Sequence, residues 1–140
     1  MQEQFVKYEQ AVALKELGFD KPCFGQFYKH PSQEKEELRL FQDCDWNDRT
    51  TSYWGTNISP NFVSAPTFSQ AFEFFREKYG LHSFIDIYPT KEEPNRCWFM
   101  IRYIDRSIEE EEDYMSGWFS CQNKAESACI NKLIEIVKNK

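Results

Sequence analysis

The run from Cys97 to Asp105, CWFMIRYID, constrains the fold more than any other segment of the chain. Successive side chains of a β-strand point to opposite faces. One face would carry Trp98, Met100, Arg102 and Ile104, and the other Cys97, Phe99, Ile101 and Tyr103. Because both faces are largely apolar, we predict a central strand that is covered on both sides. We expect the N-terminal half of the chain or a second subunit to cover the Trp98 side.

One further strand is predicted on each side of this run. His82–Tyr88 (HSFIDIY) precedes it across the turn PTKEEPN, and Tyr114–Phe119 (YMSGWF) follows it beyond the acidic connector IEEEED. Apolar side chains bounded by turn residues are typical of short strands. The three runs predict an antiparallel meander.

Helical patterns flank the meander. Thr67 and Gln70 form a capping-box pattern before an amphipathic run that ends at Gly80-Leu81. A second helix is predicted to begin at Ser120 or Asn123. Its apolar positions are Ala125, Ala128, Cys129, Leu133, Ile136 and Val137. Residues 66–138 are therefore predicted to form an α-β-β-β-α unit.

The N-terminal part, residues 1–60, is predicted to be a helix followed by a hairpin and a long loop. The helix spans about residues 6–17 and ends at Gly18, with Phe19 folding back on Leu14. Cys23–Lys29 and Glu37–Gln42 read as two strands. Residues 43–65 have no clear period, and a loop of this length suggests a role in function.

These patterns predict a single α+β domain over residues 1–140, in the order α-β-β-α-β-β-β-α. Its antiparallel sheet is packed by the two strongest helices on one face, with the N-terminal helix and hairpin extending or covering it. The chain is 41% hydrophobic and 17% aromatic, which is typical of a folded protein.

Charge and cysteine usage narrow the setting and the partners. The net charge of −6 disfavours nucleic acid and anionic membranes, although a local basic patch would still allow nucleic acid to bind. Five widely spaced cysteines without a C-x-x-C pair indicate free thiols in a reducing compartment. Without a signal-peptide or membrane-span pattern, we expect a cytoplasmic protein. No cofactor or metal is expected, and a homodimer is an open alternative.

Two groups of side chains are candidates for binding. Trp46, Tyr53 and Trp54 lie in the long polar loop with Arg49 between them, where they would stack on a base or anchor a protein partner. Alternatively, these rings fold back over the sheet as a lid. The second group is Gln122, Asn123 and Lys124, at the start of the last helix, where they would meet phosphate.

Signals for catalysis or metal binding are weaker. Cys121 at a helix N-terminus is the best nucleophile, but nothing places a base such as His30 or His82 beside it. An enzyme would need Cys121, or acids such as Asp43, Asp45 and Asp48, to converge in a pocket. The acidic run Glu109–Asp113 offers carboxylates to Ca²⁺ or Mg²⁺, yet it lacks calcium-loop spacing and is typical of a solvated charge run.

Two resemblances bear on function. The segment from Pro66 to Val137, with its last helix SCQNKAESACINKLIEIV, resembles double-stranded-RNA-binding domains, which implies their fold and an RNA ligand. Of that family's phosphate-binding lysines only Lys124 remains, and PTKEEPN lacks the family's Gly-Pro and His.

Over nearly the whole chain, YEQAVALKELGFDKPCFGQFY, SAPTFSQAFEFFREKYGL and AESACINKLIEIVKNK are similar to small uncharacterised proteins encoded by phages, prophages and mobile elements of gut Bacteroidetes. That resemblance implies a setting in a bacterial host cell. We therefore expect a non-catalytic accessory protein that binds another protein, with a nucleic-acid-binding module as the alternative.

Overall fold

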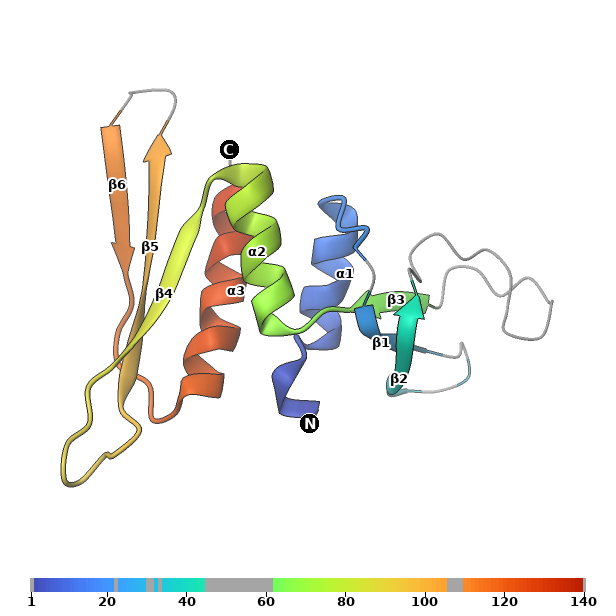
Figure 1. Ribbon diagram of the computed structural model, residues 1–140, viewed down its shortest axis with the longest axis horizontal. Coiled ribbons are helices and arrows are strands. Elements are labelled where there is room, and N and C mark those ends of the chain that lie inside the picture. The colour runs from blue at the N-terminus through green and yellow to red at the C-terminus, as the bar shows by residue number, and fades with distance from the viewer. Residues whose placement is uncertain are drawn as a thin grey trace. The chain divides into compact units, whose positions relative to one another are not determined.

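A computed structural model describes residues 2–21, 23–29, 32, 34–44, 62–105 and 110–139. Within these ranges the protein is α+β (Figure 1), as predicted. The elements are η1 (Gln2–Gln4), α1 (Tyr8–Glu16), β1 (Cys23–Tyr28), β2 (Glu37–Cys44), β3 (Phe62–Ala65), α2 (Phe68–Tyr79), β4 (His82–Ile87), β5 (Cys97–Asp105), β6 (Glu110–Met115) and α3 (Gln122–Lys138). The chain divides into two compact units, Met1–Thr67 and Phe68–Lys140.

The N-terminal unit is a helix packed on a three-stranded antiparallel sheet of order β2-β1-β3. The rings of Tyr8 and Phe27 meet edge to face, with centroids 5.7 Å apart, and so join α1 to β1. The apolar core of this unit comprises Val6, Ala11, Leu14, Phe19, Phe27, Val63 and Ala65. Burial of these side chains is the main force that holds a short helix to a small sheet.

The end of α1 follows the sequence prediction. Gly18 has a φ of 94°, a conformation that glycine adopts without steric cost. The chain then turns back, and the Phe19 N–H donates to the Leu14 carbonyl at 2.9 Å. Both side chains are buried, so the predicted contact of Phe19 with the end of the helix is confirmed.

One strand was not predicted. β3 lies within the segment 43–65 that we expected to be a loop, and β2 also continues into that segment as far as Cys44. The register pairs Gly25 with Ala65 and Phe27 with Val63. Four residues carry too little periodic signal to reveal a strand, and β3 is defined by its pairing with β1 far away in the sequence.

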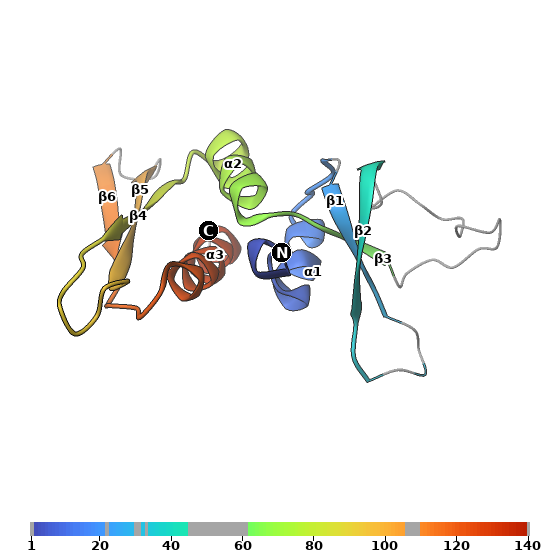
Figure 2. The ribbon, with the colours of Figure 1, turned by 60° about the horizontal axis from the view of Figure 1, so that its bottom comes forward.

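The C-terminal unit has the predicted α-β-β-β-α order. Its antiparallel sheet has the order β4-β5-β6, so β5 is the central strand, as predicted. Figures 1 and 2 show α2 and α3 on the same side of this sheet. The most deeply buried side chains between the helices and the sheet are Phe75, Leu81, Cys97, Ile101, Cys129, Ile130 and Leu133. Within this unit, helices cover only the Cys97 side of β5.

The predicted limits of the third strand were wrong. We expected Tyr114–Phe119, but β6 spans Glu110–Met115 and contains most of the acidic run. β6 lies at the edge of the sheet, and a sequence rich in acids is typical of an edge strand that is protected against pairing with another strand. The strands also form two three-stranded sheets rather than one, because the pairing of β1 with both β2 and β3 completes a sheet within the N-terminal unit.

The two helices of this unit match their predictions at the ends that the structure describes. α2 ends at Tyr79, the next residue Gly80 has a φ of 67°, and the Leu81 N–H donates to the Phe75 carbonyl at 3.2 Å. α3 begins at Gln122 with Cys121 as its N-cap, between the two predicted starts. Its buried face holds the predicted Ala125, Cys129 and Leu133, together with Ser127, Ile130 and Ile134.

Candidate binding surface

The first predicted group, Trp46, Arg49, Tyr53 and Trp54, lies outside the described residues. The second group lies in the first turn of α3, as expected. There the Gln122 side-chain amide donates to Glu126 Oε1 at 2.8 Å, and Lys124 Nζ donates to Ser120 Oγ at 3.3 Å. Asn123 is partly exposed beside them. The polar ends of Gln122 and Lys124 are thus engaged with their own helix and its cap.

A larger exposed surface lies on the side of the C-terminal sheet that faces away from α2 and α3. Alternation along the strands places Phe84, Trp98, Met100 and Met115 on this side, which we call the open face. Phe84 is 47% exposed and Met115 is 60% exposed, and Phe84 meets the Trp98 ring edge to face with centroids 6.5 Å apart. Large apolar side chains gathered on one exposed face are a common mark of an interaction surface.

At one end of the open face, three side chains form what we call the Trp118 cluster: Tyr88, Arg96 and Trp118. The guanidinium carbon of Arg96 lies 3.8 Å from the centroid of the Trp118 ring. Tyr88 meets the same ring edge to face, with centroids 6.0 Å apart and an interplanar angle of 69°. Tyr88 is 60% exposed and Trp118 is 52% exposed. The guanidinium therefore lies against the face of an indole that remains open to solvent.

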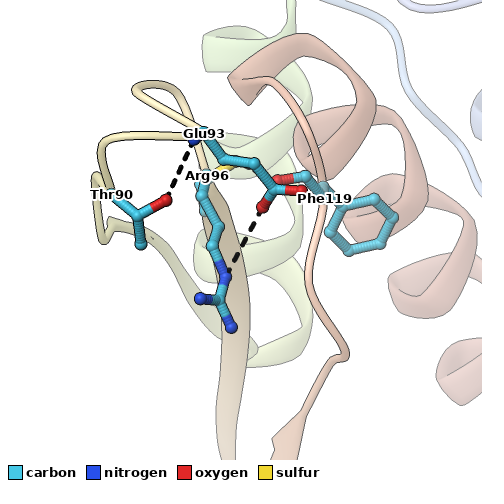
Figure 3. A network of polar contacts seen from close by, with 5 residues as sticks. Thr90, Glu93, Arg96 and Phe119 are labelled. Atoms are coloured by element: carbon cyan, nitrogen blue, oxygen red, sulfur yellow. Dashed lines mark hydrogen bonds and ion pairs between the residues drawn. The ribbon is translucent and has the colours of Figure 1, made fainter.

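The β4–β5 loop holds Arg96 in place through its own hydrogen bonds (Figure 3). The Glu93 N–H donates to Thr90 Oγ1 at 2.9 Å, and the Thr90 N–H donates to the Glu93 carbonyl at 3.0 Å. The Glu93 carboxylate lies 3.8 Å from Arg96 Nε. Figure 3 shows the two terminal nitrogens of Arg96 pointing away from that carboxylate. They remain available as a planar pair of donors.

Trp118 reaches Arg96 because the segment after β6 pairs with the start of β5. The Cys97 N–H donates to the Phe119 carbonyl at 3.0 Å, and the Phe119 N–H donates to the Cys97 carbonyl at 2.8 Å. The Phe119 ring stacks on Phe99, with centroids 5.9 Å apart. Arg96 precedes Cys97 and Trp118 precedes Phe119 in the sequence. The pairing of Cys97 with Phe119 therefore brings Arg96 and Trp118 close together.

Charges around the open face are balanced locally. Arg102 binds Asp113 in a two-pronged ion pair, with Nε to Oδ1 at 2.9 Å and Nη2 to Oδ2 at 3.1 Å. The hydrogen bond from Arg102 lowers the pKa of the Asp113 carboxyl. Cations with their own carboxylates make a weak site for a polyanion.

Two cysteines of the C-terminal unit, Cys97 and Cys129, are buried and poorly suited to act as nucleophiles. Burial raises the pKa of the Cys97 thiol, and it raises that of Cys129 to about 12. Cys97 pairs with Ile87 on one side and with Phe119 on the other. Cys121, two residues after Phe119, therefore lies toward the Ile87 end of β4. His82 is five residues farther along β4, about 16 Å away at the usual rise of a strand. His82 is thus not placed to activate Cys121.

Metal binding by acidic side chains was the other chemistry considered from the sequence. In the part of the chain that the structure describes, no three His, Cys, Asp or Glu side chains are grouped to hold an ion. Asp113 from the acidic run instead binds Arg102. Of the loop acids considered for catalysis, Asp45 and Asp48 lie outside the described residues.

Sequence reasoning did not identify the Trp118 cluster. Tyr88 and Trp118 were assigned to strands, and Arg96 follows a turn, so no short motif connects them. The cluster could have been found only by predicting that Phe119 pairs with Cys97, and that prediction requires knowing where β6 ends.

No family model, curated protein or solved structure matches the chain. None of the helices within the described ranges combines the length and the apolar character needed to cross a membrane.

Proposed function

We propose that this chain is a non-catalytic protein-binding module whose partner docks on the Trp118 cluster. The observation that carries the proposal is the contact of Arg96 with an exposed indole, together with Tyr88. Trp, Tyr and Arg are the residues that most often dominate the energy of protein interfaces. Here all three meet on one small exposed surface.

The geometry of Arg96 indicates the chemistry of the partner. Its terminal nitrogens point away from Glu93 and match a carboxylate, which accepts two parallel hydrogen bonds from a guanidinium. The rings of Tyr88 and Trp118 offer apolar surface beside that donor pair. A fitting partner presents an Asp or Glu side chain next to an aliphatic or aromatic one.

The backbone segments that carry the Trp118 cluster are held in place before any partner binds, which lowers the entropic cost of binding. Hydrogen bonds within the β4–β5 loop hold Arg96, and the bridge between Cys97 and Phe119 fixes the segment that carries Trp118. A surface that is ordered before binding loses less conformational freedom when the partner arrives.

A nucleic-acid-binding module is the second candidate. Exposed Trp and Tyr rings beside an arginine also suit stacking on bases, and the C-terminal unit has the α-β-β-β-α order of double-stranded-RNA-binding domains. The net charge of −6 and the acids Glu92 and Glu93 in the same loop argue against a polyphosphate ligand. These charges make a protein the favoured partner.

The setting of the proposal comes from the sequence resemblance. A similarity to phage, prophage and mobile-element proteins supports an accessory protein that acts in the cytoplasm of a bacterial host. Free thiols without a C-x-x-C pair are consistent with that compartment. Burial raises the pKa of the thiols of Cys97 and Cys129, which disfavours these two cysteines as nucleophiles.

The test is capture of partners from a bacterial lysate by three forms of the tagged chain, with and without nuclease. The forms are wild type, Trp118→Ala and Phe24→Ala, the last removing an equally exposed ring on β1 in the other unit. We expect a nuclease-resistant protein that wild type and Phe24→Ala retain. Trp118→Ala should lose at least about 2 kcal/mol of binding, or roughly thirty-fold in affinity.

Two results contradict the proposal. Equal recovery by Trp118→Ala and wild type would show that the cluster is not the binding site. Recovery of nucleic acid that disappears with nuclease would favour the second candidate.

A further inference from the structure

The C-terminal sheet has two edges, and they differ in chemistry. The order β4-β5-β6 leaves β4 and β6 each paired on one side only. The free side of an edge strand presents backbone N–H and C=O groups that can pair with another strand. Charged side chains are a usual protection against such pairing.

The β6 edge is protected and the β4 edge is not. β6 carries four consecutive acids, Glu110–Asp113, so two copies of this edge would bring carboxylates together. β4 reads HSFIDI and contains one acid, Asp86, with no Lys, Arg or Pro. Its Phe84 is also exposed on the open face. Of the two edges, β4 is therefore the one suited to accept a strand.

The sequence of β4 is complementary to itself. When two copies pair antiparallel about Phe84, Phe84 lies opposite Phe84 of the second copy. His82 then lies opposite Asp86 of the second copy, and the reverse pair forms two residues away on the other side of the centre. Within its own chain Asp86 lies opposite Trp98, and no described cation forms an ion pair with it. The second copy would supply an imidazole partner for that carboxylate.

We propose that a second copy of this chain pairs with β4, antiparallel and centred on Phe84, to form one six-stranded sheet across two molecules. Alternation places His82, Phe84 and Asp86 on the open face, so an aromatic pair lies between two His–Asp pairs there. The β4–β4 interface does not use the Trp118 cluster, and the proposal does not depend on the partner discussed above.

The test is sedimentation velocity of the purified full-length chain over a range of concentrations. We expect wild type to dimerise reversibly. His82→Glu places two carboxylates opposite each other at both ends of the interface, and Asp86→Lys removes the acid from both pairs. Each single variant should weaken the dimer by roughly ten-fold or more. The double variant, His82→Glu with Asp86→Lys, restores opposite charges and should recover most of the affinity.

Glu110→Lys is the matched control, because it changes a charge on the opposite edge and should leave the dimer intact. Circular dichroism of each variant checks that it folds. A wild-type chain that remains monomeric at all concentrations would overturn the proposal. Single variants that dimerise as well as wild type, or a double variant no better than the singles, would overturn it too. Partner capture through Trp118 is measured separately, so either proposal can fail alone.

Discussion

At the scale of single residues, Cys129 is the titratable group that the fold perturbs most clearly among those described. It lies on the buried face of α3, and burial raises the pKa of its thiol to about 12. A hydrogen bond with Ser83 opposes that rise, while the charge of Glu126 adds to it. The reactive form of a cysteine is the thiolate, so Cys129 is unreactive at neutral pH.

This shift predicts how the free energy of unfolding depends on pH. In the unfolded chain the thiol ionises near its ordinary pKa of 9.0, whereas in the folded protein it keeps its proton up to about pH 12. Stability is therefore fully present below pH 9 and falls as the pH rises through this window. The slope contributed by Cys129 should approach about 1.4 kcal/mol per pH unit.

Urea unfolding of wild type and Cys129→Ala between about pH 8 and pH 10.5 measures this slope. Other cysteines, tyrosines and lysines also titrate there, so the difference between the two proteins is the relevant quantity. We expect the gap in stability between wild type and Cys129→Ala to narrow as the pH rises. Curves that stay parallel would show that the thiol of Cys129 ionises equally in both states.

At the scale of elements, α1 and α2 end in the same way. Gly18 and Gly80 both have positive φ values, of 94° and 67°. In each case the following residue, Phe19 or Leu81, folds back to hydrogen-bond the helix and is buried. A residue with a Cβ atom is strained in this conformation, and the apolar residue after it anchors the turn.

Replacing Gly80 tests the importance of this turn, with Gly117 as the control. A Cβ atom added at either position would meet no atom within 4 Å, so neither substitution causes a clash. Only Gly80 has a positive φ of the two. Gly80→Ala should lower the free energy of unfolding by about 1 to 2 kcal/mol, whereas Gly117→Ala should change it by less than about 0.5 kcal/mol. Equal effects in denaturant unfolding would contradict this explanation.

The elements that could be predicted from the sequence are those set by local chemistry. Glycine residues at helix C-termini predicted the helix ends at Gly18 and Gly80. The apolar pattern on both faces predicted the central strand at Cys97–Asp105. β3 and the limits of β6 could not be predicted, because partners far away in the sequence determine them. The Trp118 cluster depends on the bridge between Cys97 and Phe119, so local sequence patterns could not predict it either.

At the scale of the whole molecule, acidic charge and exposed aromatic surface occur together. The chain carries 23 acidic and 17 basic residues, yet its C-terminal unit exposes the aromatic side chains Phe84, Tyr88 and Trp118. Net negative charge limits non-specific contact with nucleic acid. Under the function proposed above, the exposed aromatic surface around Arg96 is what a particular protein partner would recognise.

The most direct test of this account is photo-crosslinking in living cells. A benzophenone side chain placed at Met115 lies on the open face and leaves Tyr88, Arg96 and Trp118 unchanged. The same group placed at Phe24 on β1 is the control. We predict a crosslink to one protein from position 115 that is absent from position 24 and is lost when Trp118→Ala is added. Equal crosslinking from both positions, or a crosslink at 115 that Trp118→Ala leaves unchanged, would contradict the account.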